Sequence, residues 1–448
     1  MQPAAARSPL PVVDVPGAGG PGINRSADRR IAFGGLLISG LYLACALASL
    51  LLPPSIRIGP WVPVHLVLAG AASTAIASLL PFFAAALVVA RPVRPAVRIG
   101  GIVGVAIGAL TAIEAYQHFA GQAVPAILAG GTFLTGLGLV GFAAFVPLRN
   151  AMGPRRPLVE RAYGLALVNV AVGVTTATLF VGGHLAVGSA WGMLKPAHAW
   201  LNLVGFASLV VIATLLHLAP TIVGARIRTR ASGRLAVLGI AIGAPVIAVG
   251  YAFGLDALAR AGAIAVLAAA LATAWHGVAV HFDRGRGHWT TDLGWHRMTT
   301  GSLVLGQAWI GAGLAIAAAR VVVLGATPAS WSLALIVGPL LIGGVVQVLI
   351  GAMTHLFPTI GPGNPGRHAI QRKLLATAAT VRLVGLNGGA ILMTVGSAVD
   401  AGTGSLVPAG LVAVGTAIGA ALLLFALALR CGPAGARRGY VAASAPRV

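Results

Sequence analysis

Residues 196–224 read PAHAWLNLVGFASLVVIATLLHLAPTIVG, and this stretch decides the class of fold. It is longer than the roughly 20 apolar residues that a helix needs to cross a bilayer. It contains no Lys, Arg, Asp or Glu. Of all 448 residues, 58% are hydrophobic and only 8% are charged, and the mean hydropathy is +0.94. Because a soluble domain carries about 25% charged residues, the composition excludes a globular cytosolic enzyme, a nucleic-acid-binding protein and a disordered protein. It predicts an all-α polytopic membrane protein.

Apolar runs of spanning length occur twelve times along the chain. We predict transmembrane helices at 30–53, 61–90, 98–120, 122–147, 160–187, 196–224, 232–254, 259–281, 298–324, 328–357, 374–399 and 404–430. These helices form one transmembrane domain over residues 30–430. Residues 1–29 are rich in Pro, Gly and Ala and are expected to be a disordered cytoplasmic tail. They are not expected to be a signal peptide, because they lack its short apolar core and cleavage site. Residues 431–448 are expected to be a second cytoplasmic tail.

The 30 Lys and Arg residues outnumber the 8 Asp and Glu residues, and their positions follow a pattern. The connections after odd-numbered spans contain only Arg57, Lys195, Arg260 and Arg320. Almost all the other basic residues lie in the tails and in the connections after even-numbered spans. Since Lys and Arg concentrate in cytoplasmic connections, we expect both termini in the cytoplasm.

An internal repeat relates the second, sixth and tenth spans. Span 6 ends in HLAPTI (217–222) and span 10 ends in HLFPTI (355–360), and the same offset places Gly205 on Gly343. Span 2 matches span 6 more weakly, with Gly70 on Gly205. Because the related spans are four apart, we predict three four-helix units around a pseudo-threefold axis. Many transporters have inverted repeats instead.

Two histidines are the strongest candidates for a site. His65 opens span 2 and His198 opens span 6, at similar depths near the outer face. Imidazole is a common ligand of haem iron and of copper, and sites in helical bundles take their ligands from facing helices. We therefore predict that the two histidines face one centre as haem or copper ligands, with Asn202 supporting His198. The alternative is that each imidazole simply lies at the wet membrane interface.

Weaker candidates lie at both ends of the bundle. On the outer side, His118 and His184 are further metal-ligand candidates, and Glu114 is a candidate to orient His118 by a hydrogen bond or to move protons. On the inner side, His217 and His355 are repeat-related histidines close to the ends of spans 6 and 10. They are candidates for a second metal site, or are helix-end histidines that reach water.

Together these features resemble subunit I of the haem–copper oxidases, in particular its cbb3-like and nitric-oxide-reductase-like branch. The segments PVHLVLAG (63–70) and HAWLNLVG (198–205) are most similar to the membrane domains of actinobacterial multicopper oxidases. The resemblance covers about residues 30–430. It implies a bacterial cytoplasmic membrane protein in which His65 matches a ligand of the low-spin haem and His198 matches a ligand of the active-site copper.

The chain departs from that family at two of its ligand positions. The family's seventh span carries a histidine pair, whereas residues 232–254 contain no histidine. The family's tenth span carries haem-ligating histidines, whereas Ile336 stands at the position that corresponds to His198, and His355 lies at the far end. If it is an enzyme, the protein is therefore expected to be a redox membrane protein and not a terminal oxidase of the usual kind.

Three functions remain open from the sequence. The first is a redox protein that binds haem b or copper near the outer face and passes electrons or copper to a periplasmic copper or redox protein. The second is a cofactor-free subunit with a structural or assembly role, which the missing ligands favour. The third is a transporter or channel for a small molecule or ion. The lipid bilayer is an expected partner of all three, and nucleic acid of none.

The charge pattern makes a direct prediction about topology. A reporter fused after Lys195 should read as external and one fused after Arg230 as internal, because the connection that contains Arg230 is rich in arginine. Fusions to alkaline phosphatase and to green fluorescent protein measure the two locations. The reverse result at both positions would show that the count of spans is wrong.

Overall fold

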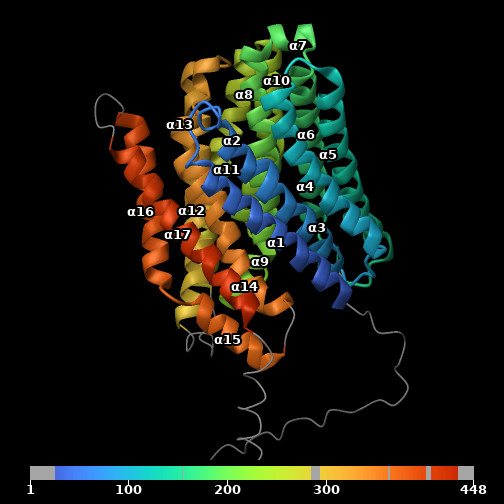
Figure 1. The fold of residues 1–448 in the computed structure, drawn as a ribbon, viewed down its shortest axis with the longest axis vertical. Coiled ribbons are helices and arrows are strands. Elements are labelled where there is room, and N and C mark those ends of the chain that lie inside the picture. The colour runs from blue at the N-terminus through green and yellow to red at the C-terminus, as the bar shows by residue number, and fades with distance from the viewer. Residues whose placement is uncertain (1–25, 154, 284–292, 362–363, 400–404, 432–448) are drawn as a thin grey trace, which may run out of the picture.

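The computed structural model describes residues 26–153, 155–283, 293–361, 364–399 and 405–431. As predicted, twelve helical spans are long and apolar enough to cross a membrane. Every regular element in the described ranges is helical. The spans lie side by side along the long axis, and the chain enters the first span and leaves the last at the same end of the bundle (Figure 1).

Each predicted span corresponds to one helix or to several consecutive helical segments. The first six are α1 (Ser26–Ser49); α2 (Trp61–His65), η1 (Leu66–Ala72) and α3 (Ser73–Leu87); α4 (Pro95–His118); α5 (Ala123–Phe145) with η2 (Val146–Asn150); α6 (Pro157–Val181); and α8 (Trp191–Ala199), η3 (Trp200–Ser208) and α9 (Leu209–Val223). The last six are α10 (Ala231–Phe253); α11 (Asp256–Phe282); α12 (Leu293–Leu324); α13 (Leu333–Ile336), η6 (Val337–Val346) and α14 (Gln347–Ile360); α16 (Ala379–Val399); and α17 (Leu406–Arg430). Short helices α7 (Leu185–Ser189), η5 (Pro328–Ser330) and α15 (Pro365–Leu375) accompany them.

Two predicted spans run five or six residues past an end of the helix that forms. The prediction of 160–187 is wrong at its end, because α6 stops at Val181 and the chain turns at Gly183, whose φ of 79° is left-handed. The prediction of 374–399 is wrong at its start. There Ala378, with a φ of 51°, separates the spanning helix α16 from the short helix α15.

Spans 2, 6 and 10 are the inner helices of the bundle. The buried share of their most apolar windows is 72%, 78% and 72%, whereas it is at most 61% in any other span. They enclose an apolar cavity of about 70 Å³ whose lining residues all belong to these three spans, among them Phe83, Leu215 and Leu349. The repeat-related spans therefore meet at the centre of the bundle.

Each inner span contains a π-helical segment, namely η1, η3 and η6. A π turn widens the helix and changes the hydrogen-bonding of its carbonyls, and within a bilayer a carbonyl needs a partner inside the protein. For η1 and η3 the preceding span supplies one. Ser39 of α1 donates to the carbonyl of Ala71 at 2.8 Å, and Asn169 of α6 donates to that of Gly205 at 2.9 Å.

The glycines that the repeat aligns lie in these π-helical segments and permit close packing. A Cβ on Gly70 would overlap the ring of Tyr42, and a Cβ on Gly343 would lie 2.6 Å from Cγ of Trp309. Both rings are held in place: the Tyr42 hydroxyl donates to a carbonyl of α4 at 2.6 Å, and Trp309 Nε1 donates to Asn387 Oδ1 at 2.7 Å. The inner spans can approach their neighbours only because these positions have no side chain.

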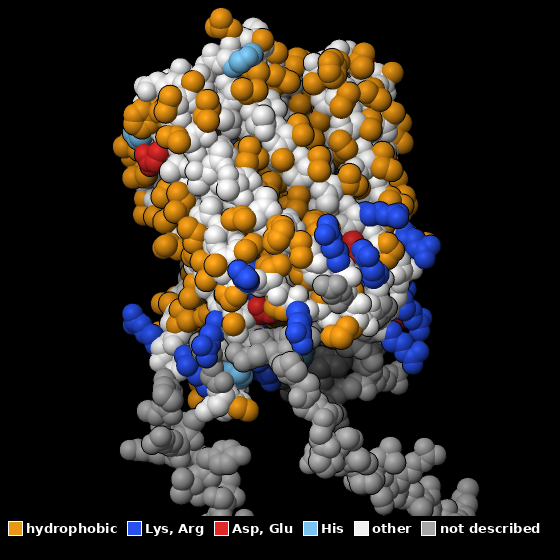
Figure 2. All heavy atoms as spheres, turned by 90° about the vertical axis from the view of Figure 1, so that its right-hand side faces the viewer, with side chains coloured by type: hydrophobic (Ala, Val, Ile, Leu, Met, Phe, Trp, Pro, Cys, Tyr) orange, Lys and Arg blue, Asp and Glu red, His pale blue; other side chains and the backbone are white. Residues whose placement is uncertain are grey.

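The two ends of the bundle differ in charge. On the face that Figure 2 shows, Lys and Arg side chains gather toward the end at which α1 begins, and hydrophobic side chains are spread over the rest of that face. We call this the arginine-rich end. Most of its arginines are exposed, but Arg98 is 3% exposed and pairs with the buried Asp28 of α1. Breaking such a buried pair is costly, so this contact ties α1 to α4.

We predict that Gly70→Val and Gly343→Val each destabilise the protein by about 1–3 kcal/mol, because overpacking forces fixed rings to move. Gly138→Val is the matched control, since a Cβ on Gly138 of α5 meets no atom within 4 Å. Thermal unfolding of the purified protein in detergent measures the effect. Equal melting temperatures for all three variants would contradict the close-packing argument.

Candidate functional site

An apolar cavity lies between spans 2 to 6, in the half of the bundle opposite the arginine-rich end. Its volume is about 150 Å³. Its walls are mostly small or apolar side chains, with two imidazoles. The lining residues are Trp61, His65, Leu68, Ala69, Ser73, Ala109, Ala112, Ile113, Ala115, Ala126, Ala129, Gly130, Phe133, Val170, Val174, Ala177, Thr178, Val181, His198, Asn202, Phe206 and Ala207.

His65 is the last residue of α2, directly before the π-helical segment η1. Its Nδ1 lies 2.8 Å from the carbonyl oxygen of Trp61. A carbonyl oxygen can only accept, so Nδ1 carries the hydrogen and donates. The imidazole also stacks on the Trp61 ring, with centroids 4.0 Å apart and planes 26° apart. These two contacts fix the tautomer and the orientation of the ring.

His198 is held in a similar way just before η3. Its Nδ1 lies 2.9 Å from the carbonyl oxygen of Gly173 in α6, so Nδ1 donates here as well. Asn202 Nδ2 donates to the backbone carbonyl of His198 at 2.8 Å and lies 3.0 Å from the ring nitrogen Nδ1. Asn202 therefore contacts His198 as the sequence predicts, from one turn further along the same span.

The structure brings His65 and His198 to one cavity, and both rings keep a free donor atom. Because each Nδ1 is occupied by a carbonyl, each Nε2 has an available lone pair. Neither Nε2 has a hydrogen-bond partner among the described residues. Two imidazoles oriented by backbone hydrogen bonds are suited to bind a transition metal.

A chain of aromatic rings connects the two histidines. Successive ring centroids are separated by 4.0 Å (His65–Trp61), 4.3 Å (Trp61–Tyr116), 6.5 Å (Tyr116–Phe180), 3.9 Å (Phe180–Trp191) and 6.0 Å (Trp191–His198). Sequence reasoning assigned none of the four intervening rings to a site, and it missed Tyr116 and Phe180 altogether. The only signal for those two is their position near the outer ends of spans 3 and 5.

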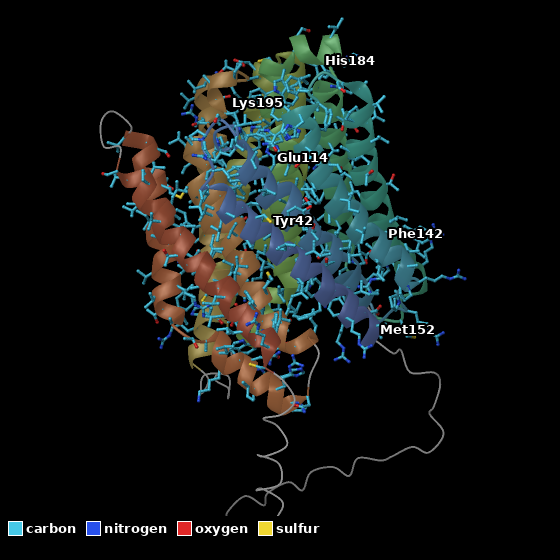
Figure 3. The ribbon with its side chains drawn as sticks, in the orientation of Figure 1. Tyr42, Glu114, Phe142, Met152, His184 and Lys195 are labelled. Atoms are coloured by element: carbon cyan, nitrogen blue, oxygen red, sulfur yellow. The ribbon has the colours of Figure 1, made fainter. Side chains whose placement is uncertain are left out.

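The other outer candidates do not line the cavity. Glu114 and His118 pair at 3.6 Å, as their spacing predicts, but their side chains are 53% and 62% exposed. His184 is exposed and directly precedes α7, outside the helix in which it was predicted. Figure 3 shows His184 and Lys195 at the end of the bundle and Glu114 closer to its middle. All three candidates are therefore separate from the two cavity histidines.

The inner candidates lie in different surroundings. His217 is buried among arginines of the connections, and neither of its ring nitrogens has a hydrogen-bond partner. His355 stacks on Trp295, with ring centroids 5.2 Å apart. The two histidines occupy equivalent positions in the repeat, but each contacts different residues.

Within the described ranges, no group of three or more His, Cys, Asp and Glu residues is placed to hold a metal ion. Of the histidines predicted as ligands, His65 and His198 line the outer cavity. No protein-family model matches the chain, and no curated protein matches it significantly.

The placement of the histidines predicts their reactivity. Diethyl pyrocarbonate should modify the exposed His118 and His184 much faster than the half-buried His65 and His198 in the folded protein. Peptide mass spectrometry over a time course measures the four rates. After unfolding in denaturant the four rates should converge, and a fast reaction of His65 in the folded protein would contradict its placement in the cavity.

Proposed function

We propose that this protein is a redox membrane protein in which His65 and His198 bind a haem b. The observation that carries the proposal is that two imidazoles with free Nε2 atoms and fixed Nδ1 hydrogens line one apolar cavity. When bound, the haem supplies one-electron redox chemistry. The protein's part is to orient the two nitrogens and to exclude water from the site.

The cavity walls favour haem over a bare copper ion. A copper ion between the two nitrogens would fill only a small part of the cavity, which extends along five spans lined by alanines such as Ala112, Ala129 and Ala177. Small flat walls suit the face of a porphyrin, and apolar surroundings suit its hydrocarbon edge. Haem iron and copper both bind imidazole, so the test must distinguish a haem from a copper ion.

We propose that the scaffold consists of three four-helix units, as in subunit I of the haem–copper oxidases. Support comes from the three inner spans, their π-helical segments and their aligned glycines. The units differ in what they place before the π-helical segment. His65 precedes η1, whereas Ile336, which is fully buried, precedes η6. With no histidine in α10 either, we assign electron transfer and not oxygen reduction to the protein.

The arrangement of charge supports an orientation for this chemistry. We place the arginine-rich end in the cytoplasm and the aromatic chain near the periplasmic face of a bacterial membrane. A soluble redox partner would then approach Trp61 and Trp191, whose rings contact the two histidines. An electron would have to cross only a short distance between that surface and the cavity.

We predict that the purified protein contains stoichiometric haem b, and that His65→Ala and His198→Ala each remove it. Asn202→Ala should weaken haem retention by roughly 10–100-fold, the usual effect of removing a group that supports a ligand. His118→Ala and His184→Ala are matched controls, because they remove outer histidines that do not line the cavity. Pyridine haemochrome spectra quantify haem, and plasma mass spectrometry quantifies copper and iron.

Three outcomes would contradict the proposal. Full haem content in the His65→Ala, His198→Ala double variant would place the haem elsewhere. Stoichiometric copper without haem would show that the two imidazoles bind copper and not haem. Absence of both metals from the purified protein, together with solute flux in proteoliposomes, would make the protein a transporter, and absence of both without flux would leave a structural role.

A further inference from the structure

We propose that a second cavity, at the arginine-rich end, binds the phosphate group of an anionic phospholipid. This cavity lies where the start of α6, the end of α9 and the start of α10 meet, and its volume is about 520 Å³. Four arginines line it, Arg155, Arg156, Arg228 and Arg234, together with His217. The proposal does not depend on haem binding in the outer cavity.

The second cavity carries an excess of positive charge. Glu160 accepts hydrogen bonds from Nε of Arg155 at 3.1 Å and from the backbone N–H of Arg156 at 3.0 Å, so Arg155 is neutralised. In the described part of the chain, no carboxylate pairs with the guanidinium groups of Arg156, Arg228 or Arg234. Three guanidinium groups around one hollow create a strong positive potential, which favours an anion.

Buried polar atoms in the same place lack partners. His217 is only 7% exposed, and neither of its ring nitrogens has a hydrogen bond. Nε of Arg156 is also buried without a partner. Leaving such groups unsatisfied is costly. An oxygen-rich anion in the cavity would accept hydrogen bonds from both residues. A basic surface that merely faces water would not account for these buried atoms without partners.

The walls of the cavity favour a lipid as the source of this anion. Leu158, Val159, Leu216 and Leu238 line it beside the arginines. Leu238 is 47% exposed and Ile242, one turn further along α10, is 58% exposed, so an apolar strip continues from the cavity along the outside of the bundle. Guanidinium groups match phosphate oxygens in geometry. Basic pockets between membrane helices bind phospholipid headgroups in this way.

The test measures thermal unfolding of the full chain in nanodiscs. Nanodiscs of phosphatidylcholine alone are compared with nanodiscs that also contain phosphatidylglycerol, and inorganic phosphate is added to the first kind. We expect phosphatidylglycerol to raise the melting temperature by several degrees and inorganic phosphate to leave it unchanged. If inorganic phosphate reproduces the shift, the site binds a free anion and the assignment to a lipid is overturned.

Two triple variants separate the cavity from general surface charge. In the first, Arg156→Gln, Arg228→Gln and Arg234→Gln are combined, and the shift should be lost. The control combines the exposed Arg30→Gln, Arg91→Gln and Arg94→Gln, which remove the same charge from the same end, and the shift should remain. Equal loss in both variants would overturn the proposal.

A measurement on the unaltered protein covers the case in which the first variant does not fold. Native mass spectrometry of the full chain, released from detergent with equal amounts of the two lipids, should show retained phosphatidylglycerol in preference to phosphatidylcholine. Equal retention of both lipids would overturn the proposal without any variant.

Discussion

Close packing of each inner span against the span before it is the contact on which the rest of the structure depends. Lipid tails are as apolar as leucine, so helices in a bilayer associate through small residues and hydrogen bonds. Here glycines in the π-helical segments allow the rings of Tyr42 and Trp309 to approach the backbone. Asn169 and Ser39 then satisfy backbone carbonyls within those segments. Close approach and satisfied carbonyls together hold spans 2, 6 and 10 at the centre.

The same packing explains why the three inner spans are not equivalent. The repeat that aligns Gly70 with Gly205 also aligns His65 with Trp200. Trp200 is fully buried and packs against Trp331, with ring centroids 5.6 Å apart. Large aromatic side chains thus occupy the region between spans 6 and 10, where alanines would leave space. The cavity lined by spans 2 to 6 keeps alanine walls and the two imidazoles, so the position that His65 occupies in span 2 is taken by a buried packing residue in span 6.

Much of the fold could be predicted from the sequence, and less of the site. The twelve spans follow from apolar length, and the contact of Asn202 with His198 follows from helical spacing. The end of α6 before the turn at Gly183 and the break at Ala378 could not be predicted, because both depend on local backbone conformation inside apolar runs. The aromatic chain through Tyr116 and Phe180 was also beyond reach. Its members come from four spans, and only the tertiary arrangement brings them together.

The central claim is that His65 and His198 hold a redox-active haem in the outer cavity. A dithionite-reduced minus air-oxidised absorption spectrum of the purified protein in detergent tests it most directly. The account predicts a sharp α-band and a Soret shift typical of a b-type haem with two imidazole ligands. A flat difference spectrum from well-folded protein expressed with sufficient haem would contradict the claim.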